Sequence, residues 1–142
     1  LRHLASLPPD FLADALPGLL QKLEEGSGSV GWYWLLCTEP GLPTLIGHGG
    51  LSGDPRVMDT LEISYCVLPQ YQNAGYATEA ARAIVAWAFS HAPLKTILAH
   101  TFLEHRASIR VLEKSAFEYA GEGPEPGTIR YAILRARMRP GP

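Results

Sequence analysis

The chain has 142 residues, of which 46% are hydrophobic and 18% charged, so it is long and apolar enough to form one domain with a sizeable core. Its formal charge is −2, whereas a protein that binds nucleic acid by neutralising phosphates is expected to carry a basic excess. Its apolar runs are too short to span a bilayer and its start lacks the pattern of a signal peptide, so we expect neither a nucleic acid nor a membrane as partner.

The two cysteines, Cys37 and Cys66, lie far apart in the sequence and form no CxxC motif. This spacing excludes a thiolate zinc cage and argues against a disulfide framework, although a single disulfide stays open. We therefore predict two free, buried thiols, no metal and a cytoplasmic location. The chain begins at Leu1 rather than Met, which leaves open the loss of a native N-terminal strand.

The first part of the chain predicts two short helices followed by two strands. Proline and glycine breaks bound the helices at residues 9–16 and 19–25, and aromatic and aliphatic runs predict the strands at 32–38 and 45–51. The glycines between 26 and 31 fit GxGxxG, but here a helix precedes the motif and a strand follows it. A dinucleotide-binding loop has the reverse order, so we set that interpretation aside.

The middle of the chain holds the clearest periodic patterns. Residues 61–68 alternate between apolar and polar side chains, which predicts a strand, and Pro69 ends it. Residues 75–91 carry apolar side chains at helical spacing from Ala77 to Phe89, which predicts a long amphipathic helix.

The last part predicts a strand at 95–101, a helix at 107–115 and strands at 117–120 and 128–138. The alternation in the final strand changes phase, and we attribute this to a one-residue bulge near Ile133. We expect the arginines here to lie on a solvated strand face and tail; they are Arg130, Arg135, Arg137 and Arg139. The element order predicts an α/β (α+β) domain with a mixed sheet flanked by helices.

The segment that joins strand 61–68 to helix 75–91 has the features of an anion site. The first turn of a helix presents unpaired N–H groups and the positive end of the helix dipole. Gly75 has no Cβ, so a ligand can approach the backbone there. The alternative is that Asn73 is simply a helix N-cap and Gly75 an ordinary turn residue, and the residues alone do not decide between the two.

Three blocks resemble the GNAT N-acetyltransferase superfamily, most closely its RimJ/RimL-like branch. They are Glu62-Ile-Ser-Tyr-Cys-Val-Leu-Pro69, Gln72-Asn-Ala-Gly-Tyr-Ala77-Thr-Glu-Ala80 and Ala107-Ser-Ile-Arg-Val-Leu-Glu-Lys114-Ser-Ala-Phe117. The core of the second, Gln72-x-x-Gly75-x-Ala77, resembles the family's acyl-CoA pyrophosphate loop. The resemblance implies a single GNAT domain over residues 1–142 with a largely antiparallel sheet. Two central strands of that fold splay where acyl-CoA enters, here 61–68 and 95–101.

The resemblance also implies how acetyl-CoA, the acyl donor, would be held. Backbone N–H groups of the loop would bind the CoA pyrophosphate; the loop residues are Gln72, Asn73, Ala74, Gly75, Tyr76 and Ala77. The strand edge from Cys66 to Leu68 would pair with the pantetheine amides, and the Val67 N–H would polarise the thioester carbonyl. The amine then attacks acetyl-CoA directly, without a covalent enzyme intermediate.

Two side chains are the implied catalytic residues. Glu62 would deprotonate the amine, directly or through water, because a primary amine is mostly protonated at neutral pH. Its alternative is a surface or hydrogen-bonded carboxylate at a sheet edge. Ser108 would assist the departing thiolate, and its alternative is an ordinary helix N-cap.

Three residues depart from the family pattern. Leu112 stands where many members have a tyrosine, His105 replaces an asparagine, and Ala116 replaces the glycine before Phe117. His105 can still donate a hydrogen bond toward pantetheine, although solvent exposure is the expectation for a lone loop histidine. His100 receives no role.

We therefore predict transfer of an acetyl group from acetyl-CoA to a primary amine, on a protein N-terminus or a small molecule. Residues 9–25 would form part of the acceptor lid, as the resemblance implies. The alternative is a non-catalytic acyl-CoA-binding domain with a sensing or assembly role, which the three departures keep open. A monomer and a homodimer are both open.

Overall fold

The computed structural model describes residues 30–37, 42–53 and 58–138, and the account below is restricted to them. The predicted helices at 9–16 and 19–25, which include the acceptor lid, lie outside the described residues. So do Arg139 and most of the GxGxxG segment.

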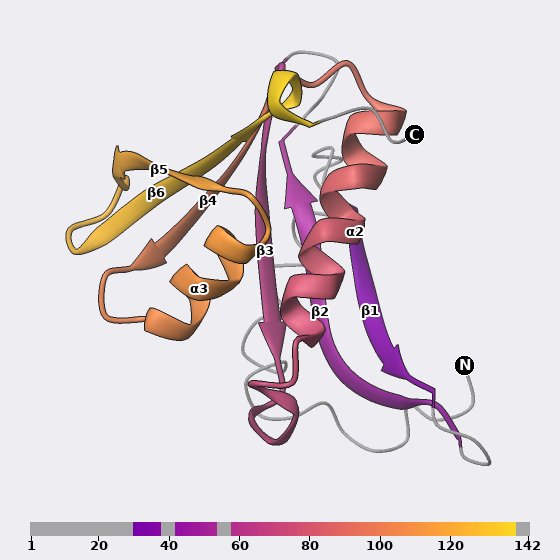
Figure 1. The fold of residues 1–142 in the computed structure, drawn as a ribbon. Helices are drawn as coiled ribbons and strands as arrows, with labels where there is room; N and C mark the ends of the chain where they lie inside the picture. Colours follow the sequence, from indigo (N-terminus) through magenta and orange to yellow (C-terminus); the bar gives the residue numbers. More distant parts are fainter. Residues whose placement is uncertain (1–29, 38–41, 54–57, 139–142) are drawn as a thin grey trace.

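Six strands form one mixed sheet in the order β1-β2-β3-β4-β6-β5 (Figure 1). The strands are β1 (Val30–Leu36), β2 (Thr44–Ser52), β3 (Thr60–Val67), β4 (Thr96–Phe102), β5 (Glu118–Glu122) and β6 (Thr128–Leu134). Every neighbouring pair is antiparallel except β3 and β4, which are parallel. The structure therefore has the predicted mixed α/β fold with a largely antiparallel sheet.

Two helices cover one face of this sheet, α2 (Tyr76–His91) over β2 and β3, and α3 (Arg106–Lys114) over β4 (Figure 1). Most of the apolar stripe predicted for α2 is buried, while Ala77 and Ala80 at its start are half-buried. The buried members are Ala81, Ile84, Val85, Ala88 and Phe89. On α3, Ile109 and Leu112 enter the same core, and Leu112 is only 1% exposed. Burial of these apolar faces is the main force that holds both helices to the sheet.

The parallel pair β3–β4 is short. Paired positions run only from Thr60 opposite Thr96 to Glu62 opposite Leu98. Beyond them each strand stays with its own antiparallel partner, β3 with β2 and β4 with β6. The structure thus has the predicted splay between the two central strands (Figure 1), and we call the region beyond Glu62 and Leu98 the divergence.

The last strand is shorter than predicted. β6 pairs with β4 without a register shift and ends at Leu134, and a 3₁₀ turn, η2 (Arg135–Arg137), follows. The bulge predicted near Ile133 is therefore wrong, because the phase changes where the chain leaves the sheet. The register shift in this part of the sheet lies in β5, between Tyr119 and Glu122.

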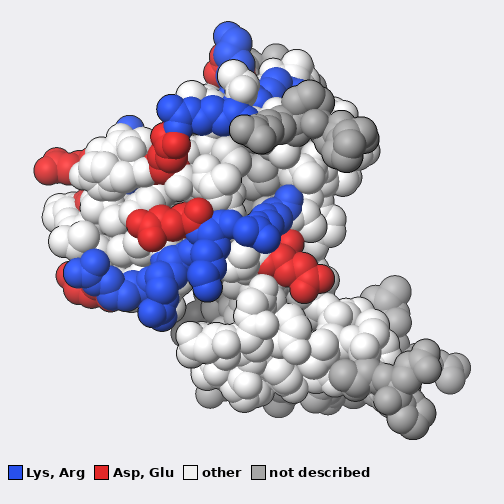
Figure 2. Space-filling view, in the orientation of Figure 1, with Lys and Arg blue, Asp and Glu red and all other residues white. Residues whose placement is uncertain are grey.

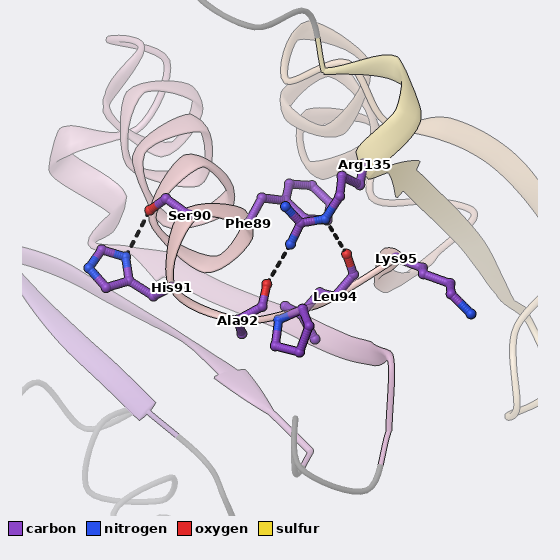
Figure 3. Close-up of a pocket in the computed structure, with 8 residues that line it drawn as sticks. Phe89, Ser90, His91, Ala92, Leu94, Lys95 and Arg135 are labelled. Carbon is purple, nitrogen blue, oxygen red and sulfur yellow. Dashed lines mark hydrogen bonds between the residues drawn. The ribbon is translucent and has the colours of Figure 1, made fainter.

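Arg135 is exposed in the turn after β6, as expected for the tail, but its guanidinium has partners that the sequence did not indicate. Its guanidinium donates to the carbonyls of Ala92 and Leu94, just beyond the C-terminal end of α2, and lies 5.1 Å from the centre of the Phe89 ring (Figure 3). A cation is favoured at this end of a helix by the negative pole of the helix dipole. These residues border a shallow hollow of about 570 Å³, and the bonds of Arg135 connect the turn after β6 to the segment after α2.

We expect Arg135→Met to lower the free energy of unfolding by about 1–2 kcal/mol, because two charge-assisted bonds to carbonyls disappear while the apolar stem remains. Arg137→Met is the matched control: Arg137 pairs with exposed Glu118, so its loss should change stability by less than about 0.5 kcal/mol. Urea unfolding followed by circular dichroism measures both, and equal losses would contradict this role for Arg135.

Candidate active site

The end of β3 directs part of its backbone toward the divergence. The Leu68 N–H bonds to the Ile46 carbonyl at 2.8 Å, so the backbone groups of Leu68 and Cys66 face β2. Successive residues of a strand direct their backbone N–H and C=O groups to opposite sides, so the backbone groups of Tyr65 and Val67 point away from β2, toward β4. Because β4 pairs no further than opposite Glu62, it does not take up these groups. Of the predicted edge from Cys66 to Leu68, Val67 therefore presents its N–H to the divergence.

The thiol of Cys66 is not a reactive centre. The residue is half-buried, and this burial raises the pKa of the thiol, so it stays protonated near neutral pH. Cys37 is exposed, so the predicted burial of both cysteines is wrong for Cys37. Because its backbone groups face β2, Cys66 offers neither a reactive thiol nor a free backbone group to the divergence, and the predicted pairing of pantetheine with Cys66 is wrong.

The loop between β3 and α2 presents backbone N–H groups. Asn73 and Gly75 have positive φ angles of 60° and 87°, and alternating left-handed residues turn successive N–H groups toward a common concavity. The first helical bond runs from the Glu79 N–H to the Gly75 carbonyl at 3.0 Å, so the N–H groups of Tyr76 and Ala77 precede it. Nothing lies within 4 Å of where a Cβ of Gly75 would stand, so a ligand can reach this backbone.

The helix N-cap is Gly75, with no side chain capping it. The alternative in which Asn73 is the N-cap is therefore wrong. Gln72 has a structural part in the loop: its N–H donates to the Pro69 carbonyl at 3.3 Å, and its Nε2 donates to the Val67 carbonyl at 3.0 Å. These bonds hold the loop against the end of β3.

Basic side chains gather in a band across the helical face, although the net charge of the chain is negative (Figure 2). Arg106, Arg110 and Lys114 are exposed on α3 at a spacing of four residues, and therefore lie on one side of that helix. Arg82 of α2 donates to the Lys114 carbonyl at 2.5 Å. Arg82 and Lys114 also line, with Gly75, Thr78 and the acidic Glu79, a hollow of about 470 Å³. An anion at the Gly75 backbone would therefore have two cations and one carboxylate beside it.

Ser108 is the third residue of α3 and is half-buried. The N-cap of α3 is His105, so the alternative that makes Ser108 the N-cap is wrong. His105 itself is exposed, with its ring edge-on to Phe102 at a centroid distance of 5.4 Å.

Tyr65 reaches α3 from β3, which the sequence did not indicate. Its hydroxyl donates to the Ser108 carbonyl at 3.5 Å. Burial raises the pKa of Tyr65, so this hydroxyl stays protonated and able to donate at neutral pH. The pattern placed Tyr65 on the apolar face of the strand, and the local sequence holds no signal for a partner 43 residues away.

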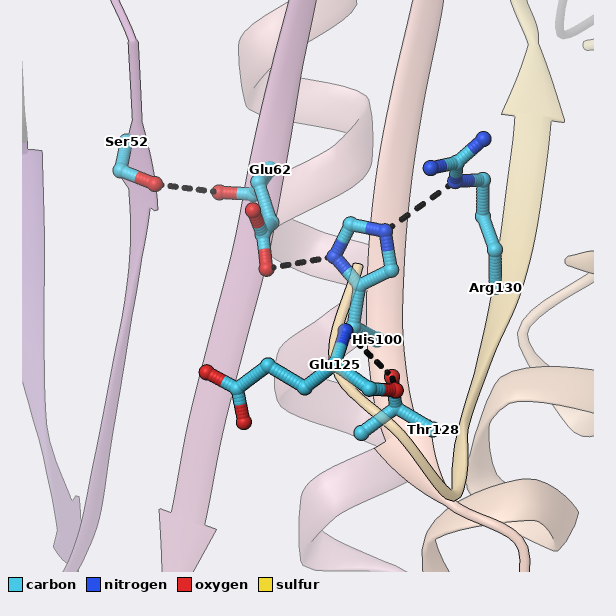
Figure 4. A network of polar contacts seen from close by, with 6 residues as sticks. All are labelled: Ser52, Glu62, His100, Glu125, Thr128 and Arg130. Atoms are coloured by element: carbon cyan, nitrogen blue, oxygen red, sulfur yellow. Dashed lines mark hydrogen bonds and ion pairs between the residues drawn. The ribbon is translucent and has the colours of Figure 1, made fainter. Parts of the chain in front are cut away.

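Glu62 lies on the sheet face opposite the helices, at the last position paired with β4 (Figure 4). Its Oε1 is 2.9 Å from Nδ1 of His100, and the Nε–H of Arg130 donates to Nε2 of His100 at 3.1 Å. The Glu62 side chain is 46% exposed, so the carboxylate is both hydrogen-bonded and accessible. Sequence reasoning gave His100 no role and placed Arg130 on a solvated face.

Within the described ranges, no group of three or more His, Cys, Asp and Glu side chains is arranged to hold a metal ion. The helices of the described part are too short or too polar to cross a membrane.

A parallel strand pair that parts early, followed by a glycine-capped helix with open N–H groups, is the arrangement that the sequence resemblance implied. The sequence model of the acetyltransferase (GNAT) domain family matches residues 9–118. The chain therefore belongs to this family.

Similar proteins agree with this assignment. The uncharacterized N-acetyltransferase YjdG of Bacillus subtilis is 28% identical over 109 residues, which are 76% of this chain and 64% of that protein. The chain thus spans less than two thirds of the length of this curated relative. The crystal structure of a GNAT-family acetyltransferase from Bacillus anthracis is 29% identical, with a TM-score of 0.65 over 75% of this chain and 67% of the other.

A more distant structure shares the fold. It is the spermidine N-acetyltransferase of Vibrio cholerae in complex with CoA and spermine, which is 20% identical. Its TM-score is 0.70 over 87% of this chain and 76% of the other.

We expect Gly75→Ala to cost about 1–2 kcal/mol of stability, because the new Cβ meets strain at φ +87° rather than a steric clash. It should also weaken CoA binding about tenfold by reorienting the loop N–H groups. Gly127→Ala, at φ +81° and equally open, is the matched control, expected to lose similar stability with unchanged CoA affinity. Urea unfolding and calorimetric titration with CoA measure the two effects. Equal CoA affinities for both variants would remove the loop backbone from the binding site.

Proposed function

We propose that this chain transfers an acetyl group from acetyl-CoA to a primary amine within a ternary complex. The observation that carries the proposal is the early separation of β3 from β4. It leaves the Val67 N–H directed toward the divergence, with the Gly75 loop beyond one end of β3 and Glu62 at the last paired position.

The backbone geometry supports the proposed binding of acetyl-CoA. The N–H groups from Asn73 to Ala77 would hold the pyrophosphate, and Gln72 would hold the loop in place through the Val67 carbonyl. Pantetheine amides would pair with the free edge of β3 at Tyr65, as an added strand would, which leaves the Val67 N–H for the thioester oxygen. The basic band beside the loop supports an anionic cosubstrate.

The reaction assigns a task to each group. The Val67 N–H would stabilise negative charge on the thioester oxygen while the amine nitrogen bonds to the carbonyl carbon. The C–S bond then breaks, and its electron pair leaves with the CoA sulfur. Glu62 takes a proton from the amine. Ser108 remains our proposed hydrogen-bond partner for the thiolate, and the bond from the Tyr65 hydroxyl to the Ser108 carbonyl supports this by helping to fix the start of α3.

The acceptor is proposed as a class. A protein N-terminus and a small-molecule amine both fit, and the name of the Vibrio cholerae relative is a reason to include polyamines in any panel. We also propose that the chain belongs to the RimJ/RimL-like branch, that it is cytoplasmic, and that it is a monomer or a homodimer.

Calorimetric titration with acetyl-CoA, beside NAD and ATP, is the first test of this function. We expect micromolar binding of acetyl-CoA alone, because only it offers both a pyrophosphate for the loop and an extended arm with secondary amides for the β3 edge. Release of free CoA thiol is then measured with polyamines, amino acids and peptides with free N-termini. Binding without thiol release from any amine would favour the non-catalytic alternative, and a lack of binding would overturn the proposal.

We expect Glu62→Gln to lower turnover about 100-fold, because the amide cannot accept the proton that the amine must lose. The dissociation constant for acetyl-CoA should stay within about twofold of wild type, since no cofactor contact is assigned to this side chain. Glu122→Gln, an exposed carboxylate at the end of β5, is the control. An unchanged rate in Glu62→Gln would remove Glu62 from the mechanism.

A further inference from the structure

We propose that His100 and Arg130 are positioning residues for Glu62: the ring of His100, fixed by Arg130, holds one carboxylate oxygen so that the other faces the acceptor amine. This inference rests on the proposed function, because it deepens the role given there to Glu62. Its basis is the continuous chain of contacts from Arg130 through His100 to Glu62 (Figure 4).

The contact between Glu62 and His100 lies at the first step of the divergence. Glu62 pairs with Leu98, the last paired position on β4, and His100 follows two residues later on the same face of that strand. No ladder bond joins β3 to β4 at His100, because the pairing has already ended. The bond between the two side chains therefore joins the strands where the backbones no longer do.

The bonding pattern determines which ring nitrogen carries the proton. His100 and Arg130 are opposite each other in the β4–β6 register, so the guanidinium reaches the ring from the neighbouring strand. Arginine only donates, so Nε2 of His100 must accept the bond from Arg130. In the neutral ring the proton is then on Nδ1, which donates to Oε1 of Glu62. This is the neutral tautomer that satisfies both contacts.

The exposed fractions of the His100 and Glu62 side chains indicate which of them can meet the substrate. The His100 side chain is 15% exposed and is held between Glu62 and Arg130, whereas the Glu62 side chain is 46% exposed. Oε1 is thus occupied by the ring, and Oε2 is the oxygen left to take the proton of the amine. A carboxylate fixed before the substrate arrives needs no reorientation during the reaction, and this lowers the barrier. Loss of the ring N–H should therefore slow turnover without weakening acetyl-CoA binding.

His100→Phe and His100→Gln test the bond in the full chain. Phenylalanine keeps a ring of similar shape without the donor, and we expect kcat to fall about tenfold with the KM for acetyl-CoA within about twofold. Glutamine keeps an N–H that can reach Glu62, and it should recover most of the rate. Thermal unfolding of both variants shows whether a loss of rate reflects a loss of structure.

A double-mutant cycle shows whether His100 acts through Glu62. In the Glu62→Gln background, His100→Phe should lower kcat by less than about twofold, because the positioned group is already gone. A full tenfold further loss in that background, or an unchanged kcat for His100→Phe alone, would overturn the positioning role.

Nitrogen NMR of the His100 ring separates this inference from the proposed function. We expect the Nδ1–H tautomer in the wild-type chain and a mixture of tautomers in Arg130→Met, whether or not an acceptor has been found. An Nε2–H ring in wild type would overturn the inference and leave the acetyltransferase proposal intact. Failure of the wild-type chain to release CoA thiol, with the Nδ1–H tautomer present, would instead overturn the proposed function, and with it the positioning role of His100 and Arg130.

Discussion

The separation of β3 from β4 after three paired positions is the constraint on which the rest of the site depends. Leaving backbone groups without partners in a sheet is costly, about 1–3 kcal/mol for each one that is buried. The chain offsets part of this cost by its own side chains: Gln72 donates to the Val67 carbonyl. The Val67 N–H has no such compensation from β4, and a ligand with amide groups is the natural complement to an edge of this kind.

Groups that suit the two proposed substrates lie on opposite faces of the sheet. The helical face carries the basic band of α3 and Arg82 beside the Gly75 loop, which suits an anionic cosubstrate (Figure 2). The opposite face carries Glu62 at the apex of the divergence, which suits a group that arrives as a cation and must lose a proton. In the proposed reaction, approach from opposite faces would let both substrates bind together, as direct attack within a ternary complex requires.

The parts of the fold that the sequence predicted well are those set by local periodicity. The stripe from Ala77 to Phe89 predicted a helix at 75–91, and α2 spans Tyr76–His91. Local patterns failed where one pattern has two causes: the phase change near Ile133 fits a bulge, but it also fits a strand that ends. The partners of Arg135 were invisible for a different reason, because it contacts carbonyls more than 40 residues away.

The site residues also differ in whether the sequence could predict their roles. The family resemblance named the loop and Val67, because backbone roles depend on the order of elements and the sequence carries that order. The contacts of His100 join residues 38 and 30 positions apart on neighbouring strands, so they depend on the register, which no local pattern reveals. No role could therefore be predicted for His100 from its neighbours in the sequence, although the sheet places it between a carboxylate and a guanidinium.

The same reasoning bears on the tyrosine that the family pattern lacks here. Leu112 occupies its place and is 1% exposed, so this position serves the core and presents nothing to a substrate. A hydroxyl nevertheless reaches the start of the same helix from another element, because Tyr65 of β3 extends to the Ser108 carbonyl. Its proton is donated to that carbonyl, so Tyr65 holds the start of α3 and is not itself assigned as the proton donor. With Leu112 in the core, Ser108 stays the proposed partner of the departing thiolate.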